Sequence, residues 1–236
     1  MTAGAAVEAL ECDGRTPYER SRVDYDDGLA TVQENAEDAW SNAMDETGVA
    51  YNAPHDGYRV ERQDEDRALL SYDVGDRSKV AVVVADGVRD WNDDEGWGVL
   101  AWAQCDPAEF PADVTEGLGV GVWEDGSGRR LPVRRVRSRQ GPEHCGWENI
   151  TFLLIGPGDA RSDWYVRDEG GEFPDLLRGT FDADATVPDD AVSTGWHRKG
   201  RELWLSHDKD AAYLVGVDDK HDVERWPAAK EPIMCA

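Results

Sequence analysis

The chain has 236 residues, of which 40% are hydrophobic, and its 50 acidic and 25 basic side chains give a formal net charge of −25. The apolar content is sufficient to fill one large core or two smaller ones, which excludes wholesale disorder. Because so negative a surface repels phosphates and anionic lipids, the sequence predicts no nucleic-acid partner. It has no apolar run of about 18 residues, so no membrane insertion is expected.

The first 28 residues are polar and rich in turn-forming side chains, and they predict an irregular arm. No basic segment followed by an apolar run stands at the start, so we expect no signal peptide in this chain. A helix is predicted next, because Asn35 is a favourable N-cap, Asp38 lies in the first turn and Gly48 suits the position after the last turn. Trp40 lies on its apolar face and is expected to anchor the helix to a sheet.

Strand-like segments follow at 58–62, 68–73, 79–85 and 98–105, separated by acidic and glycine-containing turns. Asp106 and Pro107 end this series. One helix packed on a four-stranded meander is a common α+β unit. We expect this half-domain to occupy residues 1–112.

The second half, 113–236, is predicted to be mainly β. A hairpin is expected around the turn at Asp125 and Gly126, and Pro132 makes its second strand an edge strand. Residues 170–195 are expected to be irregular. The predicted strands are 120–124, 131–137, 150–155, 164–167, 202–206, 211–217 and 223–226. The predicted fold class is therefore α+β, mainly β, with two small antiparallel-sheet half-domains.

Four cysteines, none close to another in sequence, predict two disulfides. Cys12 and Cys105 are 93 residues apart and Cys145 and Cys235 are 90 apart, so these two couples would tie each half near its own ends. The alternatives are the two other pairings and four free thiols. The absence of C-x-x-C spacing disfavours zinc binding and dithiol redox chemistry. Disulfides indicate an oxidising location, outside the cell or in the cell envelope.

Six arginines crowd into residues 129–139 of an otherwise acidic chain. Forked guanidinium groups bind carboxylates and phosphates, so Arg134, Arg135 and Arg137 are candidate binding residues. The alternative is that these arginines neutralise acidic loops and hold the two halves together.

Exposed tryptophans bind sugars and protein partners. The tryptophans in or beside loops are the candidates for this role: Trp91, Trp97 and Trp196.

No catalytic or cofactor motif is complete. Ser127 lacks the G-x-S-x-G elbow of hydrolases, and the five histidines include no H-E-x-x-H pair. The acidic segment 90–96 begins like a calcium-binding EF-hand loop, but Ala101 stands where the bidentate Glu is required. We therefore expect no metal and no cofactor, and the balance favours a protein that is not an enzyme.

Three stretches are distinctive together: WAQCDPAEF at 102–110, GPEHCGW at 141–147 and VERWP at 223–227. They resemble uncharacterised proteins of high-GC actinobacteria that are predicted to be exported or envelope-associated. The resemblance covers most of the chain and implies an extracytoplasmic setting. It carries no activity and no site residues.

The leading interpretation is a non-catalytic secreted or cell-envelope module that binds a protein or glycan partner through the arginines and tryptophans named above. The first alternative is a hydrolase-like enzyme whose site is assembled between the two halves. The second is a cytosolic, salt-adapted acidic protein with free thiols, since acidic surfaces stay hydrated at high salt.

Overall fold

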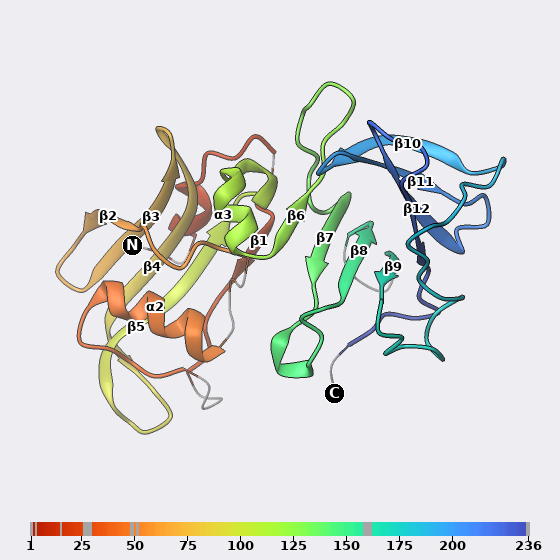
Figure 1. The fold of residues 1–236 in the computed structure, drawn as a ribbon. Coiled ribbons are helices and arrows are strands. Elements are labelled where there is room, and N and C mark those ends of the chain that lie inside the picture. The colour runs from red at the N-terminus through yellow and green to blue at the C-terminus, as the bar shows by residue number, and fades with distance from the viewer. Residues whose placement is uncertain are drawn as a thin grey trace. The chain divides into compact units, whose positions relative to one another are not determined.

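The computed structural model describes residues 2, 4–14, 16–25, 30–47, 50, 52–157 and 162–234 (Figure 1). The chain divides into two compact units, Met1–Leu118 and Gly119–Ala236. Three antiparallel sheets and few helices make the protein mainly β, which confirms the predicted fold class. The sequence placed the boundary after residue 112, at the start of α3 (Ala112–Gly117), which belongs to the first unit. None of the helices in the described part of the chain has the length and apolar character needed to cross a membrane.

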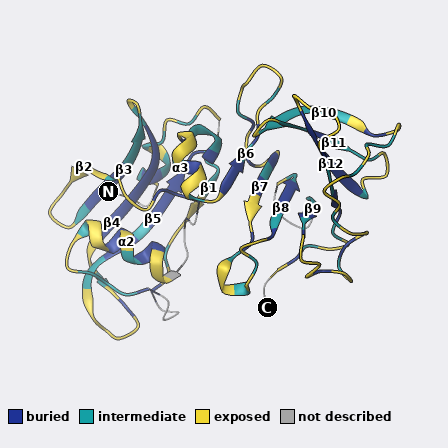
Figure 2. Ribbon diagram, viewed as in Figure 1, coloured by how far each residue is buried: buried dark blue, intermediate teal, exposed yellow. Residues whose placement is uncertain are grey.

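The first unit is built on a five-stranded antiparallel sheet with the order β1-β5-β4-β3-β2. Its strands are β1 (Glu19–Ser21), β2 (Arg59–Gln63), β3 (Arg67–Val74), β4 (Arg77–Arg89) and β5 (Glu95–Gln104). The four strands predicted between residues 58 and 105 are all present. β4 is buried on both faces over most of its length (Figure 2), which explains its continuous apolar run in place of an alternating pattern.

The helix α2 (Ala36–Thr47) packs against β4 and β5. Asn35 caps it as predicted, because its side-chain Oδ1 accepts a hydrogen bond from the backbone N–H of Asp38 at 2.9 Å. Trp40 is 2% exposed and belongs to the core between helix and sheet, which confirms its predicted anchoring role. The predicted end at Gly48 lies outside the described residues.

The prediction of an irregular N-terminal arm was wrong, because this segment contains α1 (Ala5–Glu8) and β1. Ala6 of α1 packs on the face of the sheet opposite α2. β1 pairs with the edge of β5, with Glu19 opposite Gln104. Neither element has an apolar period of its own, and both form because the finished sheet offers a face and an edge. Two further short helices follow β5, namely α3 and η1 (Pro107–Glu109), where the sequence predicted only an end.

The predicted bridge between Cys12 and Cys105 is present, with a Cα–Cα distance of 5.2 Å. It ties the N-terminal arm to the residue that follows β5. Cys145 is also disulfide-bonded, and its predicted partner, Cys235, lies outside the described residues. The disulfide prediction is thus confirmed for the first unit.

Two four-stranded antiparallel sheets form the second unit, with the orders β6-β7-β8-β9 and β10-β11-β12-β13. The strands of one sheet are β6 (Val120–Val122), β7 (Val136–Gln140), β8 (Thr151–Ile155) and β9 (Asp163–Arg167). Those of the other are β10 (Val192–Arg198), β11 (Arg201–Leu205), β12 (Ala211–Gly216) and β13 (Val223–Pro227). Side chains from both sheets share one core, which includes Trp123, Leu153, Leu203 and Trp226.

The edges of these two sheets meet. Glu124, just after β6, exchanges two backbone hydrogen bonds with His197 of β10, at 2.9 and 2.8 Å. Tyr165 of β9 forms an antiparallel bridge with Ala228, just after β13. The strands of the second unit therefore close into a barrel-like ring around the core, and this closure pairs backbone groups that open edges would expose.

Pro132 alters the predicted hairpin. β7 begins at Val136 and not at Leu131, because residues 132–135 form a turn in which the Arg135 N–H donates to the Pro132 carbonyl at 2.8 Å. Because of this turn, the alternation of buried and exposed side chains does not continue unbroken from Leu131 into β7. Val136 is buried and Arg135 is exposed. β7 lies between β6 and β8, so the prediction of an edge strand was wrong.

The turn that precedes this segment is confirmed. Glu124 and Arg130 form the antiparallel bridge that closes it. Within the turn, the hydroxyl and backbone N–H of Ser127 donate to the Asp125 carboxylate. Further hydrogen bonds come from Arg129, and together these donors lower the pKa of Asp125 to about 2.

Gly141, in the connection between β7 and β8, has no room for a side chain. A Cβ there would overlap the carbonyl oxygen of Trp147, which is backbone and has little freedom to yield. We expect Gly141→Ala to lower the free energy of unfolding by about 1–3 kcal/mol, measured by urea unfolding. Gly126→Ala is the matched control, because a Cβ at Gly126 meets no atom within 4 Å. Equal stability of the two variants would contradict this explanation.

Candidate functional site

The predicted arginines lie in the turn before β7 and in β7 itself. Arg134 and Arg135 are exposed, and Arg137 is half-buried with its guanidinium group donating to the Val133 carbonyl at 3.0 Å. The Cζ atom of Arg135 lies 4.8 Å from the ring centroid of Trp196, within the range of a cation–π contact. The structure thus brings two of the predicted binding residues together in the second unit.

The three predicted tryptophans differ in exposure. Trp91, in the loop between β4 and β5, is 56% exposed. Trp97 is half-buried in β5 and packs against the core of the first unit. Trp196 is half-buried in β10 and packs against the core of the second unit. Trp91 alone among them offers most of its surface to solvent.

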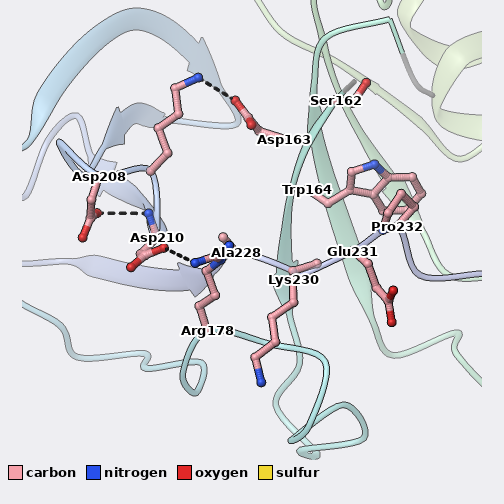
Figure 3. A pocket seen from close by; sticks show the side chains of 12 residues that line it. Ser162, Asp163, Trp164, Arg178, Asp208, Asp210, Ala228, Lys230, Glu231 and Pro232 are labelled. Atoms are coloured by element: carbon pink, nitrogen blue, oxygen red, sulfur yellow. Dashed lines mark hydrogen bonds and ion pairs between the residues drawn. The ribbon is translucent and has the colours of Figure 1, made fainter. Parts of the chain in front are cut away.

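A pocket of about 330 Å³ in the second unit combines polar side chains with an indole ring (Figure 3). We call it the polar pocket. Four segments contribute to it: the start of β9, the loop between β11 and β12, the chain that follows β13, and Arg178. The residues that line it are Ser162, Asp163, Trp164, Arg178, Asp208, Lys209, Asp210, Ala228, Ala229, Lys230, Glu231 and Pro232.

Backbone hydrogen bonds hold these segments together. The Ala229 N–H donates to the Trp164 carbonyl at 2.8 Å, and the Ala228 N–H donates to the Asp210 carbonyl at 2.9 Å. The Lys230 N–H donates to the Leu176 carbonyl at 2.8 Å. The pocket is therefore positioned by the same seam between β9 and β13 that closes the barrel-like ring.

The charges in the polar pocket are largely paired. Lys209 Nζ lies 3.0 Å from a carboxylate oxygen of Asp163, and a guanidinium nitrogen of Arg178 lies 3.2 Å from a carboxylate oxygen of Asp210. The Asp210 N–H donates to the Asp208 carboxylate at 3.1 Å, and this backbone hydrogen bond is the main cause that lowers the pKa of Asp208. Four acidic and three basic side chains line the pocket, so its lining is far closer to neutral than the chain as a whole.

Two buried donors lie beside these charges. The indole Nε1 of Trp164 and the hydroxyl of Tyr165 are buried, and neither has a hydrogen-bond partner among the residues that the structure describes. Burial raises the pKa of Tyr165, and the negative charges of Asp163, Asp208 and Asp210 raise it further. Tyr165 therefore stays neutral at physiological pH and keeps its hydroxyl proton.

Within the described residues, one group of metal-ligating side chains has its ligand atoms within 4.8 Å of one another: Cys12, Cys105 and Glu109. The two sulfur atoms are joined in the disulfide and are not thiolates, so this group is not a set of metal ligands in the oxidised protein. The described carboxylates of the polar pocket form no such group.

Sequence reasoning did not identify the polar pocket. The acidic turn at Asp208 and Asp210 and the strand-like segment that contains Trp164 carry no sequence motif of a binding site. Their convergence had no local signal, because residues 162–164, 178, 208–210 and 228–232 are far apart along the chain. Pairing between β9 and the chain after β13 is what brings them together.

Comparison with protein-family models, with curated proteins and with solved structures finds no match to this chain. The resemblance to exported actinobacterial proteins therefore stays a prediction.

Proposed function

We propose that this protein is a non-catalytic binding module and that the polar pocket binds a glycan. The observation that carries the proposal is the meeting of the Trp164 indole with alternating carboxylate, guanidinium and ammonium groups in one recess. A sugar ring has an apolar C–H face and a rim of hydroxyls that both donate and accept hydrogen bonds. An aromatic ring beside mixed donors and acceptors is complementary to both parts.

The nearly balanced charge of the lining favours a neutral polar ligand over a strongly charged one. Asp163 and Lys209 hold each other, as do Asp210 and Arg178, so each group is fixed in place before a ligand arrives. Each of these groups has further donor or acceptor sites beyond its ion pair. Asp163 and Asp210 are each paired with a cation, and hydrogen bonding lowers the pKa of Asp208, whereas a catalytic general acid needs a raised pKa. These features support binding over catalysis.

The location that we propose is extracellular or in the cell envelope. The support is the disulfide between Cys12 and Cys105, since such bonds persist in oxidising compartments. A protein partner is the second candidate ligand, because Trp91 is 56% exposed and exposed tryptophans are frequent binding hot spots.

Glycan-array binding with the full chain tests the proposal. We expect the wild type to retain one class of glycan, and Asp210→Asn to weaken its binding by roughly ten- to a hundredfold in Kd, because about 1.5–3 kcal/mol is lost with one charge-assisted hydrogen bond. The matched control is Trp91→Ala, which removes an exposed aromatic ring in the other unit and should leave glycan binding unchanged. Absence of retention on a panel of neutral, acidic and basic glycans, or binding that Asp210→Asn does not alter, would refute it.

A further inference from the structure

A second pocket lies in the first unit, between α1, β1 and β5, with a volume of about 350 Å³. We call it the arginine pocket. Arg20 and Arg22 line it from the edge of the sheet, and Val7 of α1 and Ala101 of β5 give it apolar walls. It combines two positive charges with a hydrophobic surface in a protein whose net charge is −25.

The register of the sheet explains why Arg20 lies on this side. Arg20 is opposite Ala103 in the pairing of β1 with β5, and Ala103 packs on the face that α1 covers. Side chains alternate along a strand, so Arg20 is placed on the face of Ala103. Arg22 follows the end of β1 at Ser21, and both exposed arginines line the same pocket.

Neither arginine has a carboxylate partner among the described residues. Most other described cations of the first unit do: Arg59 Nε lies 2.6 Å from a carboxylate oxygen of Asp73, and Lys79 Nζ lies 2.6 Å from a carboxylate oxygen of Glu109. Acids outnumber bases 50 to 25 in the chain, so two neighbouring guanidinium groups without a carboxylate are a departure from the surrounding pattern. Like charges on one pocket repel each other, and a bound anion would relieve that repulsion.

We propose that the arginine pocket binds a small organic anion, with a carboxylate or phosphate head held by Arg20 and Arg22 and an apolar body against Val7 and Ala101. Guanidinium groups present paired N–H donors whose spacing matches the oxygens of both head groups. The site is independent of glycan binding, because the polar pocket lies in the other unit.

The experiment is an NMR titration of the full chain at constant ionic strength, with benzoate and phenyl phosphate as probes that share one apolar body and differ in the head group. Inorganic phosphate is the third probe and tests whether the apolar body contributes. We expect saturable shifts of the Val7 and Ala101 amide signals with at least one of the two aromatic probes, and weaker binding of inorganic phosphate. Which aromatic probe binds more tightly identifies the head group.

The double variant Arg20→Gln, Arg22→Gln should weaken binding of the preferred probe at least tenfold. Arg62→Gln is the matched control, because Arg62 is an exposed arginine on β2 at the opposite edge of the same sheet. It should bind as the wild type does. If the folding of the double variant is impaired, the single variant Arg20→Lys is used. It keeps the positive charge but lacks the paired N–H donors of a guanidinium group, and its loss of affinity for the preferred probe should be intermediate. Absence of saturable shifts with all probes, or equal losses in the Arg62 and Arg20/Arg22 variants, would overturn the proposal.

Discussion

Replacing Cys12 and Cys105 together by alanine is expected to lower the free energy of unfolding of the first unit by about 4 kcal/mol. The bond joins residues 93 apart in sequence, so its loss releases a long loop in the unfolded chain and raises the entropy of that state. Amide hydrogen exchange of the full chain measures this decrease in the free energy of unfolding. Protection of the most buried amides of β4 should fall by the full amount, and protection in β8 should stay as in the wild type.

The amides of β8 are the internal control for this change, because β8 belongs to the other unit. Unchanged protection in β4 would contradict a stabilising role of the bond. Alkylation of the unreduced wild-type protein provides a second check and should label none of the four cysteines of the sequence. Labelling of Cys12 or Cys105 would argue against the proposed oxidising location.

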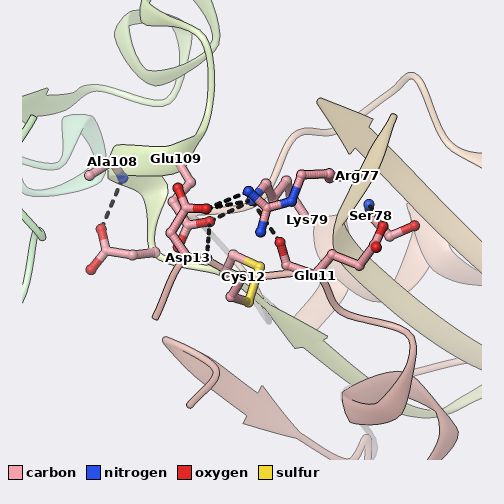
Figure 4. A network of polar contacts seen from close by, with 10 residues as sticks. Glu11, Cys12, Asp13, Arg77, Ser78, Lys79, Ala108 and Glu109 are labelled. Carbon is pink, nitrogen blue, oxygen red and sulfur yellow. Dashed lines mark hydrogen bonds and ion pairs between the residues drawn. A yellow bond between two sulfur atoms is a disulfide. The ribbon is translucent and has the colours of Figure 1, made fainter. Parts of the chain in front are cut away.

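Replacing Lys79 by alanine is expected to lower the free energy of unfolding by about 3–5 kcal/mol. The Lys79 side chain is only 4% exposed, and its ammonium group donates to the Glu109 carboxylate at 2.6 Å and to the Glu11 carbonyl at 2.8 Å (Figure 4). Without it, the Glu109 carboxylate, whose side chain is only 10% exposed, loses the ammonium group that it pairs with. Urea unfolding of the full chain, with hydrogen exchange of the β4 amides as the probe, measures the loss of unfolding free energy.

Two variants test whether an unpaired buried charge causes this loss. The double variant Lys79→Met, Glu109→Leu removes both charges and should recover most of the stability. Arg77→Gln breaks an exposed ion pair with Asp13 nearby and should cost less than about 1 kcal/mol. A loss at Lys79 no larger than the loss at Arg77, or a double variant as unstable as Lys79→Ala, would contradict the explanation.

Both changes remove contacts that hold the segment around Cys12 against the rest of the first unit. Cys12 lies between Glu11, whose carbonyl binds Lys79, and Asp13, which pairs with Arg77. Figure 4 shows the disulfide and these polar contacts gathered around the arm. Because they share one backbone segment, we infer that their stability effects are coupled and that the losses do not add.

Local signals were sufficient for several elements. α2 was predicted because Asn35 caps it and Trp40 lies on its apolar face, and both features act within a few residues of the chain. The strands of the first meander were predicted because β3 and β4 carry dense apolar runs between clear turns. The turn at Asp125 was predicted because Asp, Gly and Ser are favoured in turns, and in the structure the Asp125 carboxylate accepts a hydrogen bond from the Ser127 N–H.

Other elements had no such signal. β1 consists of three residues that face solvent or lie half-buried, and it exists because β5 presents an open edge. β10 has no fully buried residue and contains Gly195 at a positive φ of 68°, beside an irregularity in its pairing with β11. Its apolar alternation is therefore too weak to be recognised. The six crowded arginines are candidate binding residues in the sequence, and only the structure shows that the Arg137 guanidinium group donates to the Val133 carbonyl and that Arg135 contacts Trp196.

The sequence by itself determined the class of fold, the capped helix and most of the strands, because caps, turns and apolar runs act over short distances along the chain. It also indicated the bridge between Cys12 and Cys105. Only the tertiary structure decided which residues gather in the polar pocket and the arginine pocket. Each pocket is assembled across strand pairings between distant segments, and the energy that selects those pairings is spread over the whole core and is not encoded in any one stretch of sequence.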